Sequence, residues 1–97
     1  MKKVIRASTD SIRRTFRSFA KNVCENAFED YELTVGYTLG AGHVIFTVYR
    51  DESMQSVHCT YVVENDNILD VYDDPESYAD LVDDVVNTLY RKQRQAL

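Results

Sequence analysis

Residues 31–39 alternate between apolar and polar side chains without a single exception. Large apolar residues occupy the odd positions, and glutamate, threonine or glycine occupies the even ones. A period of two residues is typical of a β-strand that buries one face and exposes the other. Segments 43–50, 55–64 and 68–72 predict further strands, of which the last is short.

Short turns separate these segments. Gly40-Ala41-Gly42 offers the positive φ angles that a tight hairpin favours, and Asn65-Asp66-Asn67 tolerates a left-handed backbone. Consecutive strands joined by such short turns pair in antiparallel fashion. The sequence therefore predicts an antiparallel meander of three to four strands.

Two amphipathic helices flank the predicted meander. The first runs from Asp10 to about Phe28, with apolar residues at three- and four-residue spacing. The second starts at Asp74-Pro75-Glu76, where an aspartate can cap the helix and proline takes its first position, and ends near Arg94. The predicted fold class is α+β, in the order helix, meander, helix, with both helices on one face of the sheet.

The 97 residues form a single predicted domain, 1–97, because no linker or repeat divides the chain. Residues 1–8 fit either a tail or a short strand through Val4 and Ile5. No apolar run reaches the ~20 residues of a membrane span, and no secretion signal follows Met1. With two cysteines and no disulfide framework, we expect a cytoplasmic protein that does not bind membranes.

Charge is divided along the chain. Residues 1–22 hold seven basic side chains and one acid, whereas residues 64–84 hold nine acids and no base. The formal net charge of the whole chain is −5. A cap and the helix dipole explain the acids of the second helix, but not those that precede it.

Nothing in the sequence predicts catalysis. Cys24, His43, His58 and Cys59 are the only thiols and imidazoles, and their spacing matches neither a nucleophile with its base nor a zinc site. His58 and Cys59 are adjacent on a strand and point to opposite faces. The prediction is a chain with no catalytic residues, no metal ligands and no cofactor, and hence not an enzyme.

The acidic stretch suggests a function in protein binding. Its carboxylates run from a turn into the start of a helix and can form one negative surface, which would steer toward a basic, nucleic-acid-binding groove on a partner protein. Tyrosine supplies rigid contact area in such interfaces. The predicted partner-binding residues are Glu64, Asp66, Asp70, Tyr72, Asp73, Asp80 and Asp83.

The first helix supports an alternative function, a nucleic-acid-binding module. Its exposed face carries Arg13, Arg14, Arg17 and Lys21, which together can neutralise several phosphates. The net charge of −5 weakens long-range attraction to nucleic acid. A third arrangement pairs the basic helix of one copy with the acidic surface of another and gives a homodimer.

Two resemblances accompany these predictions. The helix–three strands–helix order, with Gly40-Ala41-Gly42-His43 before Phe46, resembles the double-stranded-RNA-binding domain in topology. That family holds RNA with lysines at the start of its last helix, where this chain has Asp74-Pro75-Glu76-Ser77, so its binding residues do not carry over.

In its small size, acidity and lack of catalytic motifs, the chain is also similar to accessory proteins of phages and mobile elements. These include anti-CRISPR and antirestriction inhibitors, several of which imitate the charge of DNA. The resemblance implies an inhibitor that acts in the cytoplasm of a host cell, for example as a DNA mimic on a CRISPR effector nuclease. It assigns no role to any single residue.

Overall fold

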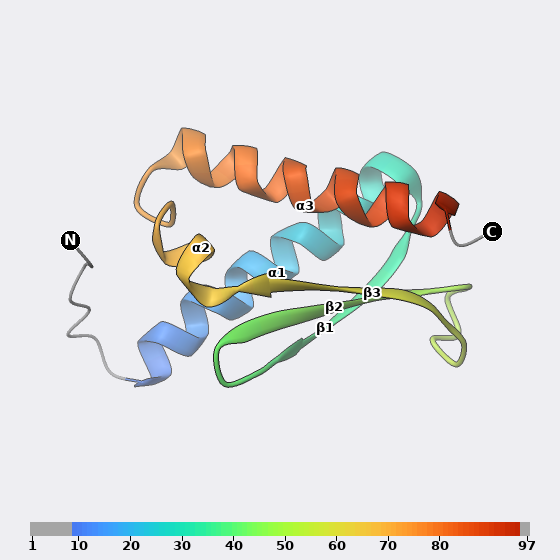
Figure 1. The fold of residues 1–97 in the computed structure, drawn as a ribbon, viewed down its shortest axis with the longest axis horizontal. Helices are drawn as coiled ribbons and strands as arrows, with labels where there is room; N and C mark the ends of the chain where they lie inside the picture. The colour runs from blue at the N-terminus through green and yellow to red at the C-terminus, as the bar shows by residue number, and fades with distance from the viewer. Residues whose placement is uncertain (1–8, 96–97) are drawn as a thin grey trace.

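The structure, a computed structural model, describes residues 9–95. The elements in chain order are α1 (Thr9–Tyr31), β1 (Thr34–Leu39), β2 (His43–Tyr49), β3 (Val57–Glu64), α2 (Asn65–Leu69) and α3 (Pro75–Gln95). The three strands form one antiparallel sheet in the order β1-β2-β3, and α1 and α3 lie on the same side of it (Figure 1). This confirms the predicted α+β fold. The prediction for residues 1–8 lies outside the described range.

Helix α1 buries the stripe of apolar side chains that the sequence predicts. It continues three residues beyond the predicted end at Phe28, to Tyr31. Glu32 then adopts a φ of 56°, and the amides of Glu32 and Leu33 donate to the carbonyls of Phe28 and Ala27 at 2.8 and 3.2 Å. These bonds satisfy carbonyl groups at the helix end. The first strand therefore starts at Thr34 and not at Tyr31, where the alternation of side chains begins.

One face of the sheet forms the floor of the core. In β2, Val44, Phe46 and Val48 are buried, while the residues between them are partly exposed. The register pairs Val48 with Val35 and Val44 with Val63, so buried side chains lie beside one another across the strands. None of the helices of residues 9–95 lies on the opposite face (Figure 1). This arrangement is the half-buried sheet that the alternation predicts.

The β1–β2 turn forms for a different reason from the predicted one. None of the three glycines has a positive φ. The amide of Gly40 donates to the carbonyl of His43 at 2.8 Å and closes the turn. A Cβ at position 40 would lie 2.6 Å from Nε2 of His43. Glycine at this position thus makes room for the imidazole ring.

The predicted fourth strand, 68–72, is wrong. Residues Asn65–Leu69 form the short helix α2, and a turn follows them. The amide of Asn65 donates to the carbonyl of Gly42 at 3.0 Å, which fixes the start of α2 beside the β1–β2 turn. Ile68 is fully buried and Leu69 packs against the core, so successive apolar residues face inward instead of alternating.

Helix α3 begins at Pro75, as predicted, and runs alongside α1. Two hydrogen bonds join the helices, from Asn22 to the Tyr78 hydroxyl at 2.8 Å and from the Tyr31 hydroxyl to Asn87 at 2.6 Å. Both bonds join residues 56 positions apart, so the two helices run in the same direction. They approach each other toward their C-terminal ends, and α2 lies at the opposite end of the molecule (Figure 1).

Phe19 lies at the centre of the core and has no exposed surface. Its ring makes edge contacts with Phe46 of the sheet, at a centroid distance of 6.3 Å, and with Tyr78 of α3, at 5.8 Å. Phe19 therefore connects α1 both with the sheet and with α3. Among residues 9–95, no helix combines the length and the apolar character of a membrane span.

Candidate functional site

The acids of the 64–84 segment all reach the surface. Each of the nine carboxylate side chains between Glu64 and Asp84 is exposed, and no lysine or arginine lies among them in the sequence. Tyr72 is 38% exposed. We use the name acidic surface for the seven residues that the sequence predicts as partner-binding, which are Glu64, Asp66, Asp70, Tyr72, Asp73, Asp80 and Asp83.

Most of the acidic surface lies at one end of the molecule. Glu64 ends β3 and immediately precedes α2, which holds Asp66, and Asp70 is the C-cap of this helix. Tyr72 and Asp73 lie in the turn that leads to α3. Figure 1 shows α2, this turn and the start of α3 together at the end opposite the C-terminus. Because residues 65–69 form a helix and not a strand, these side chains lie closer together than they would along an extended chain.

Asp80 and Asp83 extend the acidic surface along α3. They lie three positions apart on the helix, which places them on the same side of it. Their exposed side faces away from Val82 and Val85, which are buried in the core.

Asp74 has a structural role at the start of α3. Its carboxylate accepts a hydrogen bond from the Ser77 hydroxyl at 2.9 Å and another from the Glu76 amide at 3.2 Å. Bonds from Ser77 and Glu76 hold the pKa of Asp74 below its usual value, because they favour the charged form. Asp74 is the N-cap that the sequence predicts for this helix.

The basic side chains of α1 lie next to the acidic surface. Arg13, Arg14, Arg17 and Lys21 are all exposed, as predicted. Arg13 and Asp66 line the same cleft, and Arg14 lines a second, shallower hollow together with Tyr72. The sequence left open whether the two charged regions lie together or apart, and the fold makes them neighbours.

The thiols are poorly suited to nucleophilic chemistry. Cys24 and Cys59 are both free and partly buried. Burial raises the pKa of Cys24 to about 11, with a smaller contribution from Glu25. Burial also raises the pKa of Cys59, against an opposing effect of Lys92. Because the thiolate is the reactive form, both thiols are held in their unreactive state at neutral pH.

His58 and Cys59 lie on opposite faces of β3, as the sequence predicts. Cys59 packs against the core, whereas both ring nitrogens of His58 are buried without a hydrogen-bond partner in the described part of the chain. Within residues 9–95 no three histidine, cysteine or acidic side chains are grouped so that they could hold a metal ion.

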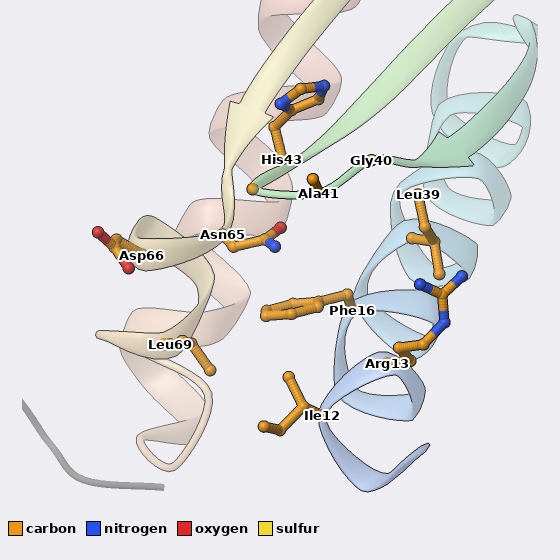
Figure 2. Close-up of a pocket in the computed structure, with 11 residues that line it drawn as sticks. Ile12, Arg13, Phe16, Leu39, Gly40, Ala41, His43, Asn65, Asp66 and Leu69 are labelled. Carbon is orange, nitrogen blue, oxygen red and sulfur yellow. The ribbon is translucent and has the colours of Figure 1, made fainter. Parts of the chain in front are cut away.

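The cleft that Arg13 and Asp66 share was not predicted. It has a volume of about 460 Å³ and lies between α1, the β1–β2 turn and α2 (Figure 2). Its walls come from three segments that are distant in the sequence, and one of them is the helix that replaces the predicted fourth strand. The sequence signal that was available, apolar residues at 68 and 69 directly after Asn65-Asp66-Asn67, fits both a strand and a helix.

Comparison with protein-family models, with curated proteins and with solved structures gives no match to this chain. Its function is therefore inferred from the geometry and charge of the chain itself.

Proposed function

We propose that this chain is a non-enzymatic inhibitor or adaptor that binds a nucleic-acid-handling protein, such as a CRISPR effector nuclease, through the acidic surface. The observation that carries the proposal is the exposure of all nine carboxylates of residues 64–84, with no base among them. A surface of this sign is attracted to grooves that otherwise hold the phosphates of nucleic acid.

The acidic surface contains both features that such an interface needs. Its carboxylates would accelerate encounter with a basic groove and orient the two proteins. Tyr72, which is exposed among them, supplies an aromatic side chain that can be buried on binding. Asp74 is outside this set, and its carboxylate caps α3 through bonds from Ser77 and Glu76.

The alternative function is nucleic-acid binding through α1. It is supported by the exposure of Arg13, Arg14, Arg17 and Lys21. A phosphate backbone laid along this helix would also approach Asp66, which lines the same cleft as Arg13, and like charges repel. The position of the acidic surface beside α1 thus favours a protein partner over nucleic acid.

A pair of matched charge-reversal variants tests the proposal. One variant carries Asp70→Lys, Asp80→Lys and Asp83→Lys on the acidic surface. The control carries Glu25→Lys, Glu29→Lys and Glu52→Lys, three exposed acids of α1 and the β2–β3 loop. Both triple variants change the net charge equally. Each is immobilised as the full chain, incubated with nuclease-treated host lysate, and the retained proteins are identified by mass spectrometry.

We expect the wild type and the control to retain the same nucleic-acid-handling protein, and added duplex DNA to displace it. The acidic-surface variant should lose this protein. Equal retention by both variants would contradict the proposal. A protein that is retained from untreated lysate but not from nuclease-treated lysate would support the alternative function instead, if it is also lost with the triple variant Arg14→Gln, Arg17→Gln and Lys21→Gln.

A further inference from the structure

The cleft between α1, the β1–β2 turn and α2 has the size of a small-molecule site. Its volume of about 460 Å³ falls within the range of roughly 300–1,000 Å³ that is usual for ligand pockets. Figure 2 shows α1 on one side, α2 on the other, and the Gly40–Ala41 segment above.

The interior of the cleft is apolar. Ile12 and Phe16 extend into it from α1, and Leu69 extends from α2 toward them (Figure 2). Leu39, at the end of β1, covers the upper part of the α1 side. Phe16 is only 7% exposed and forms the floor, whereas the other three are partly exposed and available for contact. An apolar group that enters here would remove these side chains from water.

Arg13 is the one arginine or lysine of the described residues that lines the cleft. The Arg13 guanidinium extends along the α1 wall to a position below Leu39, and the Asn65 amide points inward from the opposite side (Figure 2). Asp66 lines the mouth, but its carboxylate is directed away from the interior (Figure 2). The Oδ1 atom of Asn65 is buried without a hydrogen-bond partner in residues 9–95.

We propose that this cleft binds a small apolar monocarboxylate. Its hydrocarbon part would pack on Ile12, Leu39 and Leu69, and its carboxylate would accept two parallel hydrogen bonds from the Arg13 guanidinium, for which the planar fork of arginine is suited. A phosphate group carries nearly two negative charges and is disfavoured beside Asp66 and the neighbouring acids.

A free metabolite and the C-terminal residue of a protein both offer this chemistry, because each can present a carboxylate on an apolar group. The site does not use the carboxylates of the acidic surface to hold its ligand. Its test can therefore fail while the proposed function stands, and the reverse also holds.

Titration of the ¹⁵N-labelled full chain, followed by NMR, tests the proposal. The probe is 4-phenylbutyrate, and its uncharged amide, 4-phenylbutyramide, is the matched control. We expect saturable shifts of the amides of Ile12–Phe16, Gly40–His43 and Asn65–Leu69, with a Kd of about 0.1–1 mM for a ligand of this size. The control should bind about ten-fold more weakly, since it lacks the charged acceptor.

Two arginine variants locate the carboxylate. Arg13→Gln should weaken binding of 4-phenylbutyrate about ten-fold or more, because it removes a charge-assisted pair of bonds. Arg17→Gln, an exposed arginine of the same helix that does not line the cleft, should leave the Kd unchanged. A short peptide ending in leucine, with a free or an amidated C-terminus, then distinguishes a protein C-terminus from a free acid as the source.

Three results would overturn the proposal. They are the absence of saturable shifts in these segments up to about 10 mM probe, equal binding of the carboxylate and its amide, and equal weakening by Arg13→Gln and Arg17→Gln. Binding of the acid by the wild type that is lost only with Arg13→Gln would support it.

Discussion

The two ends of the layer formed by α1 and α3 differ in how their side chains are used. At the C-terminal ends of both helices, Tyr31 and Tyr90 stack with ring centroids 4.0 Å apart, and Arg94 lies 5.6 Å above the Tyr90 ring. At the other end, α2 lies beside α1, clefts open, and charged side chains face solvent. We call these the closed end and the open end. The closed end holds the stacked pair of rings, and the open end holds both clefts and most of the acidic surface.

Phe19 lies between the two ends and should give the largest loss of stability. Phe19→Ala removes a fully buried ring that contacts both Phe46 and Tyr78, and we expect the free energy of unfolding to fall by about 3–5 kcal/mol. Urea denaturation measures this loss. Phe28→Ala, at a ring that is 50% exposed, is the control and should cost far less. Similar losses for the two variants would contradict the assigned core.

The closed end should show direct coupling between its two rings. In a double-mutant cycle with Tyr31→Ala and Tyr90→Ala, we expect a coupling energy of about 0.5–1.5 kcal/mol, because stacked aromatic rings contribute beyond the area that they bury. Urea denaturation of the four proteins gives the value. Tyr31→Phe, which keeps the ring and removes only the hydroxyl bond to Asn87, should retain most of the coupling. A coupling energy of zero would show that the stacked rings do not stabilise the closed end, and this would contradict the contrast between the two ends.

At the open end, we expect Asp74→Ala to lower the stability of the fold, and to do so by less than the changes at Phe19, Tyr31 and Tyr90. Asp74→Ala should lower the urea midpoint at pH 7, because the cap bonds to Ser77 and Glu76 are lost. The pKa of Asp74 is lowered in the folded state, so the unfolded chain binds its proton more readily. The contribution is therefore present above the ordinary aspartate pKa of about 3.9 and is lost as the pH falls through the lowered value.

Measurements of the urea midpoint between pH 7 and pH 2 check this prediction. The difference between wild type and Asp74→Ala should shrink as the solution is acidified. Asp84→Ala, at an exposed acid of the same helix, is the control and should leave the midpoint nearly unchanged at pH 7. A difference for Asp74→Ala that stays constant over this pH range would show that its carboxylate does not cap α3.

Local patterns predicted most of the fold. The alternation around Val35 and Val44, the apolar stripe through Phe19, and the Asp74-Pro75 start of α3 each reflect a preference that the tertiary structure also satisfies. The ends of the elements were predicted less accurately. Tyr31, for example, continues the alternation of β1 but belongs to α1. Its ring is held by Tyr90, a contact across 59 positions that no local pattern contains.

The open end was the part that the sequence predicted least well. Residues 68–72 read as a strand because apolar and acidic side chains alternate there in part, but Ile68 and Leu69 both pack inward from a helix. Their position depends on the bond from Asn65 to Gly42 and on the space beside α1. The exposure of the acids could be predicted from composition, whereas the cleft between Arg13 and Asn65 depends on how three separate segments pack.

Carbodiimide cross-linking of the retained partner to the full wild-type chain tests the central claim most directly, because this reagent joins carboxylates and lysine amines that are in contact. Mass spectrometry then locates the joined residues. We predict cross-links from partner lysines to carboxylates of residues 64–84, at the open end. Cross-links confined to Glu25 and Glu29 of α1, to Asp51 and Glu52 of the β2–β3 loop, or to Lys21 would contradict the account.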